Sequence, residues 1–414
     1  MGDKLTSRER VLLSLNHEEP DRIPIDLGSA RSTGINAIAY RDLLQYLQLN
    51  SDVKVFDVKQ LLAIPGQNIL ERFGCDVVML HGIRPSLGLS LDEWKEGRLP
   101  VDGGRCLVPA GFNPVMQSDG SEAIFDCAGH LLAKRPKDGL YFDEFYHPLE
   151  EAVSREEVDM LPMPEISDDE LAYLSRRAKE LYEKTDYAIS GATSFSLFEK
   201  GTKDFGYETF LTNLYTEPEL VEYYLDKLTA AYIVWMEKYL DAVGDYIQIV
   251  QNNDDLGMQQ GMIISPELYR RFFKPRHEKI IKAIKNKKKG VFVFLHSCGS
   301  IYPVMNDLIE AGFEIFNPVQ YNAADMDPQR LKKEFGRKCT FWGGGVDTQN
   351  TLAYGTADDV AAEAKKMIQI FSPGGGFIFN AVHNIQAGVA PDKIVALYDT
   401  AKKYGVADFY KGEN

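Results

Sequence analysis

The sequence predicts an α/β fold, a TIM (β/α)8 barrel with an N-terminal helical segment and an antiparallel insertion. From about residue 169 onward, six amphipathic helices alternate with six short apolar runs, which is the rhythm of consecutive βα units. An earlier apolar run at residues 75–80 brings the strand count close to the eight of a barrel. Small and polar residues follow almost every apolar run, as expected of active-site loops at the carboxyl ends of barrel strands.

The N-terminal part supplies the helical segment and the first strands. Residues 6–16 predict a capped amphipathic helix that ends before Pro20. Residues 22–28 alternate like a short strand, and the small, polar loop after them carries Arg31. Helical patterns follow at 40–49 and 66–73, before the buried strand at 75–80. We expect Arg31 to lie at the mouth of the barrel and to bind substrate.

Residues from about 87 to 151 differ in character from the rest of the chain. They are rich in Gly, Pro, Asp and aromatic residues, with short alternating runs and no long helix. We interpret them as an antiparallel insertion in a single barrel domain that spans residues 1–414. A flap beside the active site and a surface decoration are equally compatible with this composition. In the first case Tyr141, Phe142, Tyr146 and His147 would close over a substrate or meet a partner.

The remaining chain alternates helix and strand to its end. Helices are expected at 169–184, 218–243, 266–285, 301–311, 327–335, 357–371 and 392–404. Strands are expected at 187–190, 245–250, 291–295, 313–316, 339–342 and 376–379. An open doubly wound sheet is the rival fold, but it would call for a Gly-rich phosphate-binding turn after an early strand. The sequence has no such turn, which favours the barrel.

Charge and composition exclude several classes of function. The net charge of −15 argues against nucleic acid and anionic membranes as partners. No stretch approaches the roughly 18 consecutive apolar residues of a membrane span, and the N-terminus lacks the apolar core of a secretory signal. The five cysteines, among them Cys127, are odd in number and scattered, which does not resemble a disulfide framework. We therefore expect a cytoplasmic protein with reduced thiols.

The strongest chemical signal is the pair His296 and Cys298, directly after a buried apolar run. In an extended segment, residues two apart share a face, so the imidazole and the thiolate would point the same way. Both groups are ligands of zinc. An isolated His-x-Cys is a weak signal, and a lone His is more often a structural hydrogen-bonding group. Their place at a strand end favours the metal site.

A catalytic zinc site typically has three protein ligands and one open position. His383, at the end of the last strand, is the leading candidate for the third ligand, because the last strands of a closed barrel return towards the middle ones. Asp254 or Asp255 could ligate instead, orient His296, tune the metal or shuttle a proton. The alternative is that one of the two carboxylates only caps a turn.

Polar side chains at other strand ends are candidates for contacts to the reacting groups. Hydrogen bonding by these amides would orient a substrate. The candidate side chains are Asn317, Gln320, Asn380 and Asn384. We also group Asn317 with the catalytic residues.

Several motifs together resemble the uroporphyrinogen decarboxylase superfamily, and more closely its branch of corrinoid-dependent methyltransferases. The resemblance covers nearly the whole chain and is weakest in the insertion. The motifs are residues 22–26 (RIPID), 254–257 (DDLG), 264–267 (ISPE), 296–300 (HSCGS), 307–312 (DLIEAG), 317–320 (NPVQ), 341–344 (FWGG) and 382–386 (VHNIQ).

The resemblance implies a TIM barrel that binds zinc and moves a methyl group to or from the cobalt of a separate corrinoid protein. The methyltransferase branch uses a His-x-Cys pair, matched by His296 and Cys298, and a later Cys. His383 stands at or beside that later position, so a His occurs where the family has a Cys. The cofactors implied are Zn²⁺ and methylcobalamin or cob(I)alamin on a partner protein. The small methyl donor or acceptor would be a methoxylated aromatic compound, a methylamine or a thiol.

Two rival functions remain. True uroporphyrinogen decarboxylases resemble the chain in fold but use no metal and grip an acidic porphyrinogen with an N-terminal Arg-rich segment. Here that region offers only Arg22 and Arg31, and a tetrapyrrole with many carboxylates would call for more cations. Metal-free decarboxylation therefore ranks second. The other rival is a non-catalytic barrel that binds a corrinoid or another ligand. The sequence leaves the oligomeric state open, a homodimer included.

Overall fold

The computed structural model describes residues 5–126, 128–406 and 409. Cys127 lies outside this part of the chain, whereas Cys75, Cys106, Cys298 and Cys339 are free thiols. Among the described residues, no helix combines the length and apolar character needed to cross a membrane.

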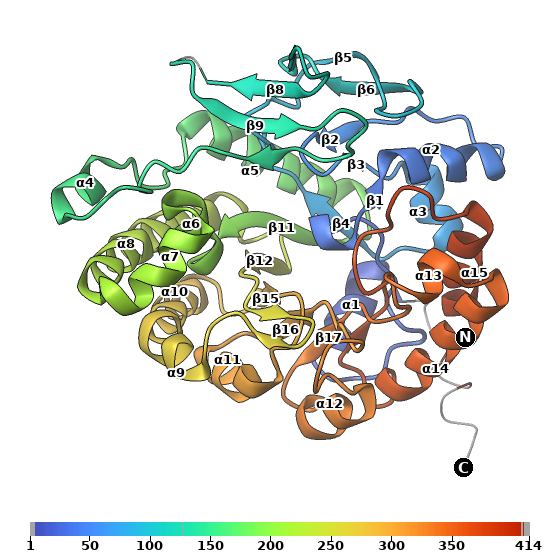
Figure 1. The fold of residues 1–414 in the computed structure, drawn as a ribbon. Helices are drawn as coiled ribbons and strands as arrows, with labels where there is room; N and C mark the ends of the chain where they lie inside the picture. Colours follow the sequence, from blue (N-terminus) through green and yellow to red (C-terminus); the bar gives the residue numbers. More distant parts are fainter. Residues whose placement is uncertain (1–4, 127, 407–408, 410–414) are drawn as a thin grey trace.

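A seven-stranded, all-parallel sheet curls through the middle of the molecule (Figure 1). Its strands are short and mostly buried because helices cover the outside, as expected of parallel sheets. The spatial order is β18-β17-β16-β15-β12-β11-β4. The bounds are β4 Val77–Leu80, β11 Ala188–Phe195, β12 Ile249–Asn253, β15 Phe292–His296, β16 Ile315–Asn317, β17 Thr340–Trp342 and β18 Phe377–Ile378.

Residues 23–26 lie between the two edge strands of this sheet. On one side, the Phe379 N–H donates to Pro24 O at 2.8 Å and the Asp26 N–H donates to Phe379 O at 2.9 Å. On the other, the Asp76 N–H donates to Ile25 O at 2.7 Å. The sequence predicts eight strands, but the described residues form seven regular ones at this sheet. Pro24 has no N–H, which explains why this segment makes an isolated bridge rather than a ladder.

The interior of the curled sheet is filled by side chains rather than open. One residue from each of the seven strands joins a buried apolar cluster with Val11 and Leu15 of helix α1 (Ser7–Leu15). Thr6 and Glu9 cap this helix with reciprocal hydrogen bonds. The strand members of the cluster are Val77, Ala188, Ile249, Phe294, Ile315, Trp342 and Ile378.

Helices surround the sheet (Figure 1). Their apolar faces pack on the strands in a second, larger cluster of buried residues. The helices are α2 Ala37–Tyr46, α3 Gln67–Phe73, α4 Arg155–Met160, α5 Asp168–Lys184, α6 Phe198–Phe205, α7 Tyr207–Thr216, α8 Pro218–Val243, α9 Pro266–Leu268, α10 Lys274–Lys287, α11 Met305–Ala311, α12 Pro328–Phe335, α13 Thr351–Tyr354, α14 Ala357–Phe371 and α15 Pro391–Tyr404.

Antiparallel strands form a layer across one side of the molecule, next to α2 (Figure 1). A hairpin pairs β5 with β6, and a second sheet has the order β10-β9-β8-β7. Nearer the N-terminus, β1, β2 and β3 form a third small sheet. The bounds are β1 Ile35–Asn36, β2 Val55–Asp57, β3 Leu62–Ala63, β5 Trp94–Arg98, β6 Arg105–Pro109, β7 Val115–Met116, β8 Glu122–Phe125, β9 Leu131–Arg135 and β10 Asp143–Glu144.

Candidate metal centre

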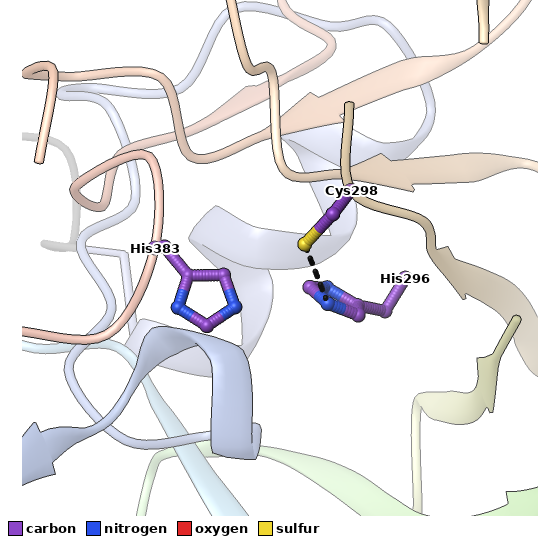
Figure 2. Close-up of side chains that lie close together, drawn as sticks. All are labelled: His296, Cys298 and His383. Carbon is purple, nitrogen blue, oxygen red and sulfur yellow. Dashed lines mark hydrogen bonds between the residues drawn. The ribbon is translucent and has the colours of Figure 1, made fainter. Parts of the chain in front are cut away.

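Three potential metal ligands lie together: His296 is the last residue of β15, Cys298 follows it, and His383 lies in the loop after β18. Their ligand atoms all lie within 4.8 Å of one another, and Cys298 Sγ is 3.4 Å from His296 Nε2 (Figure 2). Two ligands of a tetrahedral zinc ion are about 3.5 Å apart, given Zn–S and Zn–N distances near 2.3 and 2.0–2.1 Å. The fold thus brings the three predicted ligands together, with the first two at ligand spacing.

The loop after β15 is held in place from two sides. The Cys298 N–H donates to Asp255 Oδ1 at 2.7 Å, and the Gly299 N–H donates to Gln320 Oε1 at 2.8 Å. Gly299 has a φ of +76°, and a Cβ there would lie 2.5 Å from backbone atoms of Gly257. Only glycine fits this close approach of two backbones. Gln320, predicted to bind substrate, here orients the ligand loop.

The tautomer of His296 is set by Asn317. The Asn317 amide nitrogen donates to Trp342 O at 2.9 Å, and its Oδ1 accepts from the Ser32 hydroxyl at 2.7 Å. These contacts identify Oδ1 as the atom that faces His296 Nδ1, at 2.7 Å. Nδ1 therefore donates, and the Nε2 lone pair faces the Cys298 thiol, 3.4 Å away. Such a partner is typical of metal-ligating histidines.

His383 has the same arrangement with a different amide. Its Nδ1 lies 3.0 Å from Asn384 Oδ1, and the Gln386 side-chain amide donates to the same oxygen. Nδ1 therefore donates and Nε2 carries the free lone pair. Burial, and secondarily the nearby His296, lowers the pKa of His383 to about 4. The neutral imidazole that a metal requires is thus the stable form at neutral pH.

Carboxyl groups surround this cluster. Asp255 Oδ1 lies 3.7 Å from His296 Nε2, and the Asp255 side chain is 39% exposed. Glu199, in the first turn of α6, accepts a hydrogen bond from the Asn253 amide at 2.5 Å. Burial, followed by the negative charge of Asp255, raises the pKa of the Cys298 thiol. A coordinated cation reverses this effect, because a metal-bound thiol is deprotonated.

Asp254 has a different place from its neighbour. It is fully buried, and its carboxylate accepts backbone N–H bonds from Leu197, Phe198 and Glu199 at 2.8–3.1 Å. His277 Nε2 donates to it at 2.9 Å. Asp254 therefore caps the N-terminus of α6, and only Asp255 of the pair faces the cluster.

Like Gln320 and Asn384, Arg31 and Asn380 were predicted to bind substrate and have protein partners. The Arg31 guanidinium forms an ion pair with Asp57 at 2.6 Å and also donates to Pro85 O. The Asn380 amide donates to Asp26 O at 3.0 Å. This hydrogen bond connects residues 23–26 to the loop that follows β18.

Tyr146 lies among the antiparallel strands. Its side chain is exposed and stacks on His130 with ring centroids 4.6 Å apart. The contacts of the described residues do not bring it to the three ligands.

Two groups near the strand ends were missed by the sequence reasoning. Burial, with the charges of Asp255 and Asp254, raises the pKa of Glu199 to about 8. His81, directly after β4, has a pKa lowered to about 3 by burial. The position of His81 after an apolar strand was a signal for it, whereas Glu199 lies within a helix and gave none.

Solved structures resemble the chain only distantly. Xylanase 10B from Thermotoga maritima is 12% identical, over 56% of this chain and 80% of that chain, with a TM-score of 0.35. Xylanase B from Clostridium stercorarium F9 is 12% identical, over 57% and 85% of the two chains, with a TM-score of 0.36. These similarities carry no information on activity.

Sequence comparison gives the family. The uroporphyrinogen decarboxylase (URO-D) family model matches residues 148–404. A uroporphyrinogen decarboxylase of Pelodictyon phaeoclathratiforme is 25% identical over 60% of this chain and 70% of its own length. That of Thioalkalivibrio sulfidiphilus is 23% identical, over 65% and 75%. With more than half of its length matched by the family model, the chain belongs to the uroporphyrinogen decarboxylase family.

Proposed function

We propose that the chain is a zinc-dependent methyltransferase that moves a methyl group between a small donor or acceptor and the cobalt of a corrinoid protein. The observation that carries the proposal is the cluster of His296, Cys298 and His383 within 4.8 Å. A decarboxylase that uses no metal has no need for two imidazoles and a thiol gathered at one point.

The donor set fits zinc. Nitrogen and sulfur ligands in a set of three leave one tetrahedral position open for a substrate atom. Each imidazole is oriented by an amide oxygen, Asn317 Oδ1 for His296 and Asn384 Oδ1 for His383. Zinc bound there would supply Lewis acidity to a thiol or to the heteroatom of a methyl donor.

The surrounding side chains have defined roles in this proposal. Asp255 is partly exposed and lies 3.7 Å from His296 Nε2, so it can accept or return the proton of an incoming thiol, alcohol or amine. Gln320 and Asn317 keep the ligand loop and the His296 ring in place. Burial and the charges of Asp255 and Asp254 raise the pKa of Glu199 to about 8, which favours its protonated form in the metal-free protein.

Decarboxylation of the uroporphyrinogen type is the second candidate, because the curated relatives bear that name. Such a substrate needs cations at the mouth to bind its carboxylates. Arg22 is paired with Asp76 at 2.6 Å, and Arg31 is paired with Asp57 at 2.6 Å. Both N-terminal arginines are therefore already engaged with carboxylates of the protein itself, which favours a small substrate of lower negative charge.

Metal analysis tests the proposal. Protein purified without chelators is expected to contain about one zinc per chain, and the His296→Ala and Cys298→Ala variants are expected to lose it. Substoichiometric zinc together with a fully active His296→Ala variant would contradict the assignment as a zinc-dependent methyltransferase.

Activity is tested by anaerobic spectroscopy of cob(I)alamin with a panel of methoxylated aromatic compounds, methylamines and methylated thiols. Formation of methylcobalamin with one class of donor identifies the substrate. Loss of CO2 from uroporphyrinogen, with no methylation of cob(I)alamin by any donor, would instead favour the decarboxylase. Cobalamin binding without either reaction would favour a non-catalytic ligand-binding barrel.

A further inference from the structure

A chain of hydrogen bonds connects the antiparallel strands to the third metal ligand. The Tyr141 hydroxyl donates to Gln386 Oε1. The Gln386 amide nitrogen donates to Asn384 Oδ1, which also accepts from His383 Nδ1. The side chains of Tyr141, Gln386, Asn384 and His383 thus form one continuous relay. Its two ends, Tyr141 and His383, are 242 positions apart in the sequence.

Both ends of the relay are anchored. Phe142, next to Tyr141, is 1% exposed, and its N–H donates to Lys59 O at 3.1 Å. At the other end, the Ile385 N–H donates to Gly34 O at 2.9 Å. The backbones at both ends of the relay are therefore held by hydrogen bonds to other segments.

The polarity of the relay decides what His383 can do. Gln386 Nε2 and His383 Nδ1 both point at Asn384 Oδ1. A reversed Asn384 amide would place its NH2 group against His383 Nδ1 and move the ring proton to Nε2. Nε2, the nitrogen on the side of Cys298 and His296 (Figure 2), would then carry the proton and have no lone pair for the metal. Gln386 Nε2 also donates to the backbone O of Asn384 at 3.4 Å, an atom that can only accept, so Gln386 Oε1 faces Tyr141. The Tyr141 hydroxyl donates to this Oε1 and holds Gln386, and through it Asn384, in the metal-competent direction.

We propose that Tyr141 is a positioning residue of the metal centre, which fixes the orientation and tautomer of His383 through Gln386 and Asn384. This inference rests on the zinc site of the proposed function. It extends the set of residues that shape that site to a segment outside the curled sheet. Residues between β9 and β10 thereby determine part of the metal affinity, although none of them is a ligand.

The test compares zinc affinity and the Co²⁺ spectrum of the full chain with those of Tyr141→Phe. Zinc affinity is measured by competition with a chromophoric chelator, and the visible d–d bands of the Co²⁺ form report ligand geometry. Removing a hydrogen-bond partner outside the ligand sphere lowers metal affinity by about 10–100-fold. For Tyr141→Phe we expect the low end, about tenfold, with altered d–d bands.

Two further variants sharpen the comparison. Gln386→Met breaks the middle of the relay and is expected to reproduce the Tyr141→Phe result. Tyr215→Phe is the matched control, because Tyr215 is 71% exposed on α7, and it should keep wild-type affinity and spectrum.

The outcomes separate the two proposals. Wild-type zinc affinity and an unchanged Co²⁺ spectrum in both Tyr141→Phe and Gln386→Met would overturn the positioning role alone and leave the zinc site standing. Absence of specific zinc binding by the wild-type chain would overturn both. A selective loss in the two relay variants, with Tyr215→Phe unaffected, would support the positioning role whatever the methyl donor proves to be.

Discussion

The amide of Asn317 determines which nitrogen of His296 is available to a metal. Asn317→Ala removes the acceptor 2.7 Å from His296 Nδ1, and we expect zinc affinity to fall by about 10–100-fold. Chelator competition measures the change. Ser32→Ala is the comparison variant: it removes the hydroxyl that donates to Asn317 Oδ1 but leaves the amide oriented by Trp342 O, so its loss should be smaller. Equal losses in the two variants would contradict a specific role of the Asn317–His296 contact.

The sequence predicted that His296, Cys298 and His383 come together, which the structure confirms, but not what orients them. His296 and Cys298 are two residues apart, so backbone geometry alone places them close together. His383 was inferred from the return of the last strand in a barrel. The partners of these rings lie far away in sequence, as with Ser32 and Asn317, which are separated by 285 positions. No periodicity of a single segment encodes such a contact, because it depends on how distant loops meet.

At the scale of elements, Asp254 and Asp255 are neighbours with separate roles. Asp254→Ala is expected to destabilise the fold by about 3–5 kcal/mol, because it leaves buried His277 and the first N–H groups of α6 without their acceptor. Asp255→Ala, at a side chain that is 39% exposed, should cost about 1 kcal/mol or less. Urea unfolding measures both. A comparable loss in the two variants would contradict the capping role of Asp254.

The segment between the edge strands, residues 23–26, should make stability depend on pH. Burial raises the pKa of Asp26 from 3.8 to about 6. The unfolded chain therefore loses this proton at lower pH than the native state does, and stability falls as pH rises from about 4 to 6. The full effect is about 3 kcal/mol, from roughly two units at about 1.4 kcal/mol each.

Asp26→Asn removes the titrating group and keeps an oxygen that can accept from the Trp342 indole, now 2.9 Å from Asp26 Oδ2. The free energy of unfolding, measured in urea between pH 4 and 7, should then lose this decline. Parallel curves for the wild type and the variant would contradict the raised pKa.

The bounds of elements with a clear apolar pattern match the prediction, whereas the bounds of a strand that contains polar residues do not. The helix at Pro218–Val243 has the predicted bounds. The strand predicted at 245–250 lies instead at Ile249–Asn253. Its second half is polar because Gln251, Asn252 and Asn253 bond to neighbouring segments near the site, for example Asn253 to Glu199 at 2.5 Å. A rule that looks for apolar runs ends such a strand too early.

At the scale of the molecule, the charge pattern predicts poor binding of polycarboxylates. The net charge is −15, and Arg22 and Arg31 are both paired internally. We expect uroporphyrinogen to bind weakly and to release no CO2 above the rate without protein. Fluorescence titration with a porphyrin polycarboxylate and an anaerobic decarboxylation assay measure the two quantities. Tight binding that is lost in Arg31→Ala would contradict this expectation.

The filled interior of the curled sheet has a kinetic consequence for the proposed reaction. Seven strand residues and two side chains of helix α1 fill the interior of the sheet, so no reactant can reach His296, Cys298 and His383 through it. In the proposed reaction, the small methyl compound and the corrinoid protein would both approach from the side of the loops that carry these residues. A docked protein would then cover the small molecule, which would have to bind first. We expect compulsory-order kinetics, in which the small methyl compound binds before the corrinoid protein. Excess corrinoid protein should then inhibit turnover, because it covers the site before the small compound has bound.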